Sequence, residues 1–368
     1  MTAVEDPARR AAPAGLTAAN AAALEHVTTA ARVRRAEALE RIARHTDADV
    51  PAMLGLIREH GRVTLNFHPD RLLVNGLTVA ESMALDGRYR SQYETGVTNG
   101  SRTAFLGGLR DGWERDLFAE AYHRDDVSPA ERPKYGAFNL AGHADGASPR
   151  FGSCHVRLRP AMTSHCTFSF HDSHLGPADV GTLDAFECVL AGLLEEAAQS
   201  GSVLGLAGAD AVAVLRGLPD RAVAASPAAA NGRSLDDYIE AQVHGEIDLG
   251  AAAEAIVLDP SFRGTRTHEI LDEVARTCGI ALEWHGGFAL AAHDVDEEFR
   301  GPQVPPLAKH VCALFGRQTF DAELVGRAAA AAIRTPQNWT AWGDQDEVLQ
   351  LVKYLWHTLV AFGRPHER

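Results

Sequence analysis

Apolar and polar residues alternate from Val63 to His68, and this period of two is typical of a half-buried β-strand. Pro69 cannot donate to a β-ladder, so the strand should end at His68. The next residues, Asp70 and Arg71, are polar. The pattern therefore predicts a strand that brings three polar side chains to the rim of a sheet.

A second polar strand is predicted at residues 238–244, where Glu240 and Gln242 alternate with apolar neighbours and point to the same face. Shorter runs predict further strands at residues 135–140, 152–158, 166–171 and 255–258. A final strand pair is expected at residues 280–284 and 288–290, joined across two glycines.

Helical periodicity dominates both ends of the chain. Thr17 is a plausible N-cap for a helix running to about residue 45, and a second helix should follow Asp49, with Pro51 in its first turn, and end near Gly61. Helices are also predicted over residues 72–86, 107–124, 267–278 and 305–363.

These elements predict an α+β protein with a mainly antiparallel sheet. The expected units are a disordered tail at 1–15, a helical unit at 16–61, a core at 62–290 and a helical unit at 291–368. A mostly helical insertion is expected at 181–230 within the core, ending in a low-complexity tract. No Gly-x-Gly-x-x-Gly follows a strand and no Walker sequence occurs, which argues against the Rossmann and P-loop classes.

Charge and composition narrow the classes of partner. A formal net charge of −14 argues against nucleic acid or an anionic membrane as the main partner. No apolar run is long enough for a membrane span, and the N-terminus lacks a secretory signal pattern. The five widely spaced cysteines do not suggest a disulfide framework. We expect a cytoplasmic protein, and export by a route without a signal peptide stays open.

Two kinds of chemistry compete with a carboxylate site. His165, His171, Asp172 and His174 cluster in the sequence but match no zinc signature, so no metal is expected. A Cys–His enzyme built on Cys154 has no base or orienting group that the sequence places beside it. Glu240 with Gln242 could instead hydrogen-bond vicinal hydroxyls such as those of a ribose, although an exposed polar strand face would give the same pattern.

Several segments together resemble a family of enzymes. Asn-Phe-His-Pro-Asp-Arg, Tyr-Glu-Thr-Gly, Lys-Tyr-Gly-Ala-Phe-Asn-Leu, Ser-Pro-Arg-Phe-Gly-Ser, Tyr-Ile-Glu-Ala-Gln-Val-His-Gly and Asp-Pro-Ser-Phe-Arg-Gly-Thr occur in this order over about residues 62–290. The set is similar to the CteC-type family of mono-ADP-ribosyltransferases, which are related to poly(ADP-ribose) polymerases and carry an Asp–Glu catalytic pair. The first segment departs from the His-Gly-Ser/Thr-Arg of the wider group, because Pro69 and Asp70 replace its second and third residues.

The resemblance implies an ADP-ribosyltransferase-like split sheet and a reaction in which ADP-ribose moves from NAD to a protein side chain. A threonine hydroxyl is the implied acceptor, and ubiquitin is a candidate target. The implied catalytic residues are Glu240, which would stabilise the cationic ribose, and Asp70, which would orient the ribose or accept a proton. The implied NAD-binding residues are His68, Arg71, Tyr135, Phe138, Asn139, Ser153 and Gln242.

Two other functions remain open on the sequence alone: an NAD glycohydrolase, and a module that binds a nucleotide or a protein without turnover. The transferase hypothesis makes a geometric prediction. His68, Asp70 and Glu240 should face one cleft, and repulsion between the two carboxylates should raise the pKa of at least one of them.

Overall fold

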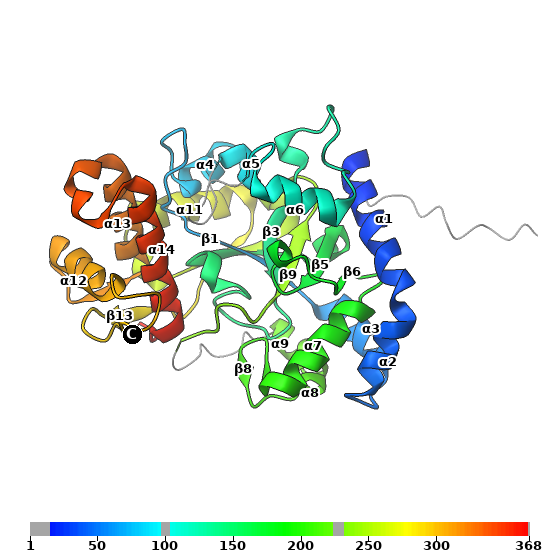
Figure 1. Ribbon diagram of the computed structural model, residues 1–368. Helices are drawn as coiled ribbons and strands as arrows, with labels where there is room; N and C mark the ends of the chain where they lie inside the picture. The colour runs from blue at the N-terminus through cyan, green and yellow to red at the C-terminus, as the bar shows by residue number, and fades with distance from the viewer. Residues whose placement is uncertain (1–14, 97–103, 224–231, 367–368) are drawn as a thin grey trace, which may run out of the picture.

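The computed structural model describes residues 15–96, 104–223 and 232–366. The tail expected to be disordered and the low-complexity tract at the end of the 181–230 insertion therefore lie almost wholly outside the described residues. Figure 1 shows a central sheet with the first helices on one side and the last helices on the other.

The N-terminal helices are α1 (Ala18–Val33), α2 (Arg35–Ala43) and α3 (Val50–His60). The side chain of Thr17 caps α1 and that of Asp49 caps α3, as predicted. The single helix expected from Thr17 to about residue 45 is wrong, because the chain leaves helical geometry at Arg34. The break lets each apolar stripe meet its own partner, since α1 packs on β6 and α6 whereas α2 packs on α7.

The described strands form one eight-stranded sheet and three two-stranded ribbons. The order in the large sheet is β12-β11-β4-β1-β3-β9-β5-β6, and only the β11–β12 pair is parallel. The strands of the sheet are β1 (Val63–Phe67), β3 (Lys134–Phe138), β4 (Cys154–Leu158), β5 (Cys166–Phe170), β6 (Val180–Thr182), β9 (Ile239–Val243), β11 (Ala253–Leu258) and β12 (Ala281–Trp284). The prediction of an α+β protein with a mainly antiparallel sheet is confirmed.

The predicted hairpin across Gly286 and Gly287 is wrong. α11 (Arg266–Cys278) crosses over after β11 and brings β12 back parallel to it, as a helical crossover allows. β13 (Ala289–Ala291) pairs instead with β14 (Thr319–Asp321) in the C-terminal unit. The two other ribbons pair β2 (Arg88–Tyr89) with β10 (Ile247–Asp248) and β7 (Ser202–Val203) with β8 (Leu206–Ala207).

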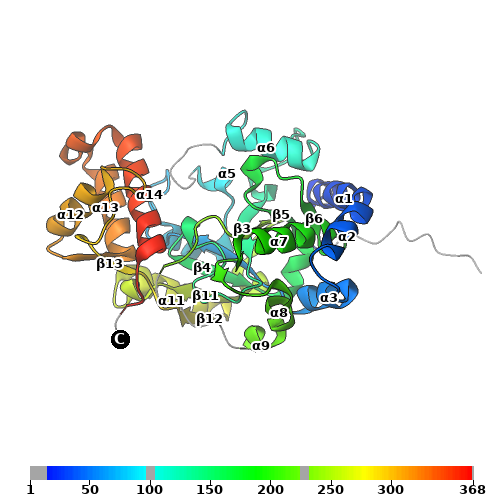
Figure 2. The same cartoon turned by 60° about the horizontal axis from the view of Figure 1, so that its bottom comes forward.

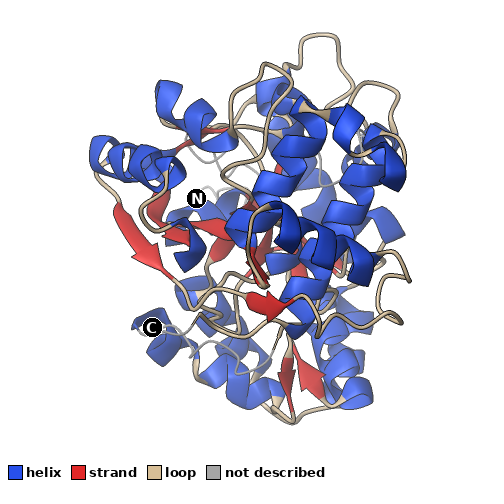
Figure 3. Ribbon diagram, turned by 90° about the vertical axis from the view of Figure 1, so that its left-hand side faces the viewer, coloured by secondary structure: helices blue, strands red, loops and turns tan. Residues whose placement is uncertain are grey.

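Helices cover the sheet and its ends (Figures 2 and 3). The helix predicted over 72–86 is shorter than expected: Thr78 and Glu81 form a capping box that starts α4 at Val79. The insertion is not wholly helical, because the β7–β8 ribbon follows α7. The remaining α-helices are α4 (Val79–Asp86), α5 (Gln92–Thr95), α6 (Leu109–Phe118), α7 (Glu187–Ser200), α8 (Ala211–Arg216), α9 (Leu218–Val223), α10 (Leu249–Ala252), α12 (Val304–Leu314), α13 (Ala322–Arg334) and α14 (Gln345–Phe362).

The alternation of side chains gives the centre of the sheet one apolar and one polar face. Val63 and Leu65 of β1 belong to the main core, as do Ile239 and Ala241 of β9. Along the opposite face the register aligns Thr64 with Ala137, Ala137 with Glu240, and Glu240 with Ser169. Polar side chains of β1, β9 and β5 are thereby gathered on one surface, with the small Ala137 of β3 between them.

Candidate functional site

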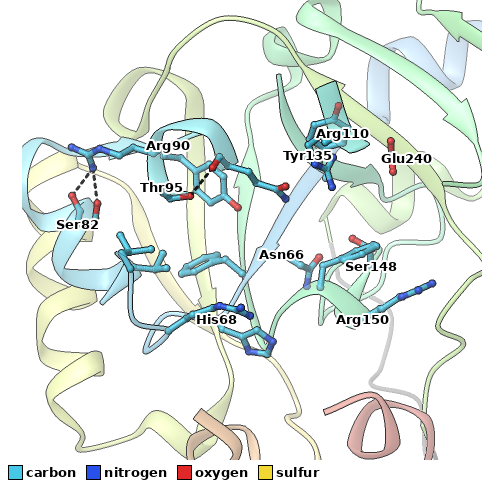
Figure 4. A pocket seen from close by; sticks show the side chains of 18 of the residues that line it. Asn66, His68, Ser82, Arg90, Thr95, Arg110, Tyr135, Ser148, Arg150 and Glu240 are labelled. Carbon is cyan, nitrogen blue, oxygen red and sulfur yellow. Dashed lines mark hydrogen bonds between the residues drawn. The ribbon is translucent and has the colours of Figure 1, made fainter. Parts of the chain in front are cut away.

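A cavity of about 380 Å³ opens over this polar face, within the size range of small-molecule sites. Figure 4 shows Asn66 and His68 in its middle, Ser82, Arg90 and Thr95 at one end, and Arg110, Tyr135 and Glu240 at the other. Its further lining includes Phe67, Arg71, Leu73, Val79, Met83, Arg88, Tyr89, Gln92, Trp113, Gly136, Ser148, Arg150, Phe151, Asp172, His174 and Lys353.

Glu240 is the most deeply buried acid in the cavity wall, with 5% of its surface exposed. Its Oε1 accepts a hydrogen bond from Gln242 Nε2 at 2.7 Å, and its Oε2 accepts one from the Ser173 amide at 3.4 Å. Burial, reinforced by the negative charge of Asp172, raises the pKa of Glu240 to about 7. The carboxyl group is thus fixed in place and is partly protonated near neutral pH.

Asp172 is the second carboxylate of the cavity. Its Oδ2 accepts a hydrogen bond from Tyr238 Oη at 3.0 Å, and its Oδ1 lies 2.7 Å from His174 Nδ1. Despite partial burial, hydrogen bonds from His174 help to hold the pKa of Asp172 below its usual value. The site therefore contains two carboxyl groups with opposite pKa shifts, an arrangement that often separates acid and base roles.

Tyr135 presents its ring to the same end of the cavity. Its hydroxyl donates to Glu114 Oε1 at 2.9 Å, and Arg132 donates to the other oxygen of Glu114 at 2.7 Å. The guanidinium carbon of Arg110 lies 4.2 Å from the centre of the Tyr135 ring, a cation–π distance. The Arg110 guanidinium group thus covers one face of the Tyr135 ring. Its central carbon also lies 5.4 Å from the centre of the Trp113 ring.

The cavity is positively charged although the chain is acidic. Against the carboxylates of Asp172 and Glu240 stand six cationic side chains, Arg71, Arg88, Arg90, Arg110, Arg150 and Lys353. Arg88, Arg90 and Arg150 pair with Glu246, Asp86 and Asp236. Those partners are exposed acids outside the lining, so the pairs are weak, whereas the mostly buried Glu94 lies 3.9 Å from Arg88 Nη2. A concentration of positive charge in a protein of net charge −14 favours an anionic ligand.

Several buried polar atoms of the lining have no hydrogen-bond partner among the described residues. They are Asn66 Oδ1, Arg88 Nε, Gln92 Oε1, Arg110 Nε, Ser148 Oγ and Arg150 Nε. Buried polar groups are normally satisfied, so their concentration here indicates a polar ligand.

His68 and Arg71 lie on the cavity, in agreement with their predicted positions. The His68 ring stands edge-on to Trp356 of α14 at 4.9 Å. Burial lowers the pKa of His68 to about 3 and that of Arg71 to about 10. His68 is therefore a neutral hydrogen-bonding group at physiological pH.

Asp70 does not line the cavity with Glu240, which corrects the prediction that His68, Asp70 and Glu240 face one cleft. Its carboxylate packs against Gly326 of α13, where an added β-carbon would overlap Oδ2. Burial, aided by Glu323 and Asp259, raises the pKa of Asp70 to about 7. The expected repulsion acts on Glu240, but it comes from Asp172.

The other predicted NAD-binding residues do not line the cavity. Phe138 lies on the apolar face and stacks on Phe168 at 4.6 Å. Asn139 forms a turn through its hydrogen bonds with the backbone of His143. Ser153 is buried beside Cys154, away from the lining. Gln242 is fully buried and acts on the site only by donating to Glu240.

Sequence reasoning missed Arg110, Trp113 and Lys353, and it placed Asp172 only in a candidate metal cluster. Among the described residues, no group of three or more His, Cys, Asp or Glu side chains could hold a metal ion. Within the same ranges, no helix has the length and apolar character needed to cross a membrane.

Comparison with known proteins gives a family but no activity. The model of a family described as protein of unknown function (DUF3626) matches residues 62–362, so the chain belongs to this family. No curated protein matches the chain. The matched region includes both the strands of the polar face and the C-terminal helices.

Proposed function

We propose that this member of the DUF3626 family is an NAD-dependent mono-ADP-ribosyltransferase that moves ADP-ribose to a protein side chain. The observation that carries the proposal is the position of Glu240. Its buried carboxyl group lines a cavity whose other walls are cationic and aromatic. These are the groups that the ribose, the diphosphate and the planar rings of NAD require.

The reaction breaks the bond between C1′ of the ribose and the nicotinamide nitrogen. The bonding electrons leave with nicotinamide, which becomes neutral, and positive charge develops on the ribose. A fixed negative charge stabilises that transition state most when it is held in place beforehand. Gln242 and the Ser173 amide hold the Glu240 carboxylate in this way.

The acceptor is proposed to be a hydroxyl group of a protein, with threonine as the side chain and ubiquitin as a candidate protein. Its oxygen would bond to C1′ and its proton would pass to a base. We assign this role to Asp172, since it lines the same cavity as Glu240 and hydrogen bonds with His174 favour its ionised form.

The sheet order supports an ADP-ribosyltransferase-like core as part of the same proposal. Three of the six segments that resemble the CteC-type family lie on or directly after β1, β3 and β9, and the other three lie at α5, before β4 and after β11. The strands β1, β3 and β9 are consecutive in the sheet. Residues far apart in the sequence are thereby brought to one surface, as a shared NAD site requires.

The test incubates the purified protein with NAD labelled in the adenylate moiety, with and without a cell lysate. A labelled protein band together with nicotinamide release supports the transferase. Release of free ADP-ribose without a labelled band would indicate a glycohydrolase, and tight binding of NAD without turnover would indicate a binding module. Either of these outcomes would overturn the proposal.

A further inference from the structure

Cationic side chains converge where α14 meets the turn before β4. Lys353 of α14 and Arg150 of the turn line the cavity. Arg300, from the loop before α12, lies beside the same helix, with its guanidinium carbon 5.9 Å from the centre of the Tyr354 ring. His357 follows Lys353 by four residues on α14, so the two side chains share one face of the helix.

The nitrogen atoms of this group are poorly satisfied. Arg150 Nε, Arg300 Nε and both ring nitrogens of His357 are buried without a hydrogen-bond partner among the described residues. His357 is 2% exposed. A neutral imidazole has one donor and one acceptor nitrogen, so these atoms are three buried donors and one buried acceptor, and their concentration in one place indicates a ligand.

The fold holds this arrangement firmly. Trp356 Nε1 donates to the carbonyl oxygens of Pro149 and Arg150 at 3.0 and 3.1 Å, which fixes α14 to the turn that carries Arg150. Arg300 has a φ of 63°, an unfavourable left-handed value for a residue with a β-carbon. Backbone strain of this kind often accompanies a functional site.

The positive charges act on one another. Burial is the main cause that lowers the pKa of His357 and of Lys353. Neighbouring positive charges add to it: Arg300, Arg150 and Lys353 act on His357, and Arg150, Arg300 and Arg71 act on Lys353. Two carboxylates face the group. Asp172 is engaged by His174 and Tyr238, and Asp236, which pairs with Arg150, is largely exposed. Within the part of the chain that the structure describes, the cations therefore lack a buried counter-charge of their own.

We propose that Arg150, Arg300 and Lys353 form a subsite for a phosphoryl anion, and that the C-terminal helical unit thereby completes the ligand cavity. On the proposed function, the anion is the diphosphate of the dinucleotide. Two guanidinium groups and an ammonium group provide the charge and the donors that phosphate oxygens need.

The test compares the binding of ADP, adenosine and inorganic pyrophosphate by calorimetry. We expect the wild-type protein to bind ADP at least tenfold more tightly than adenosine, and pyrophosphate to compete with ADP. Lys353→Met and Arg300→Met should each weaken ADP binding about tenfold or more, as expected for loss of a charge-assisted hydrogen bond. Neither change should alter adenosine binding.

Lys309→Met is the matched control, because Lys309 is an exposed lysine on α12 of the same unit. It should leave ADP binding unchanged. Circular dichroism and thermal unfolding establish that each variant is folded. Equal affinities for ADP and adenosine, or unchanged ADP affinity in folded Lys353→Met and Arg300→Met, would overturn the subsite.

The subsite and the enzymatic activity can fail separately. If ADP binds as described but the protein releases no nicotinamide from NAD, the subsite stands and the proposed transferase falls. If nicotinamide is released and both variants keep the wild-type KM for NAD, the transferase stands and the subsite falls. A raised KM with little change in kcat supports both.

Discussion

Burial raises the pKa of two carboxyl groups, Glu240 and Asp70, to about 7, but they lie in different surroundings. Glu240 accepts two hydrogen bonds and lines a cavity rich in cations. The Oδ1 atom of Asp70 is buried without a hydrogen-bond partner among the described residues, and its side chain is covered by Gly326. A raised pKa therefore does not by itself mark a site, and access to a ligand decides between the two.

The largest expected effect is on turnover. Glu240→Gln keeps the size of the side chain and removes its charge, and it should lower nicotinamide release about 10²–10³-fold, the usual cost of losing one electrostatic stabiliser. Asp70→Asn is the matched change at the carboxyl group that lies outside the cavity, and this variant should retain turnover within a few-fold. If Asp70→Asn loses as much activity as Glu240→Gln, the conclusion that only Glu240 belongs to the site is wrong.

The next largest effect is on the stability of the fold where Gly326 packs against Asp70. Gly326→Ala places a β-carbon against Asp70 and should lower the free energy of unfolding by about 1–3 kcal/mol, as overpacking does. Gly55→Ala in α3 is the control, because an added β-carbon there meets no atom within 4 Å. Urea unfolding measures both, and equal stabilities of the two variants would contradict the close packing.

Asp70→Asn should also change how stability depends on pH. The pKa of Asp70 is higher in the folded protein than the ordinary 3.8, so the folded state binds more protons than the unfolded state between about pH 4 and 7. The free energy of unfolding of the wild type should therefore fall as pH rises through this range. Asp70→Asn removes the part of this fall that is due to the ionisation of Asp70. We expect Asp70→Asn to gain about 3 kcal/mol over wild type between pH 4.5 and 8, measured by urea unfolding. A difference that does not vary with pH would contradict the raised pKa.

The smallest effect is on the pH dependence of turnover. If catalysis needs ionised Glu240, nicotinamide release should rise about tenfold between pH 6 and 8, with an apparent pKa near 7. Asp70→Asn should keep this profile, since the two acids lie in separate surroundings. If the pH profile of turnover shifts in Asp70→Asn, the titration near pH 7 belongs to Asp70 and not to Glu240, which would contradict the prediction.

The strands could be predicted because alternation fixes which way each side chain points. The same rule placed Glu240 and Gln242 on one face, and the register aligns Glu240 with Ala137 on that face. It also explains the error at Phe138: three positions separate it from Tyr135, so the two side chains point to opposite faces of β3. Asp70 was misplaced because it lies in the turn after Pro69, where alternation no longer applies.

The rest of the site depends on tertiary packing. Arg110 comes from α6, Asp172 from the turn after β5 and Lys353 from α14. None follows from a local pattern, because each reaches the cavity only when its element docks on the sheet. Tertiary packing also decides where some helices end. The break at Arg34 reflects the different packing partners of α1 and α2, which the local sequence does not show.

The anchoring of α14 to the turn before β4 by Trp356 has a consequence for biosynthesis. More than a hundred residues separate Glu240 from Lys353, and a ribosome adds about 5–20 residues per second. The sheet that carries Glu240 is thus synthesised on the order of ten seconds before the helix that completes the cavity. During this interval a nascent chain has made Glu240 and five of the six cations of the lining but lacks Lys353, so we expect the proposed phosphoryl subsite to be completed only when the last helix docks.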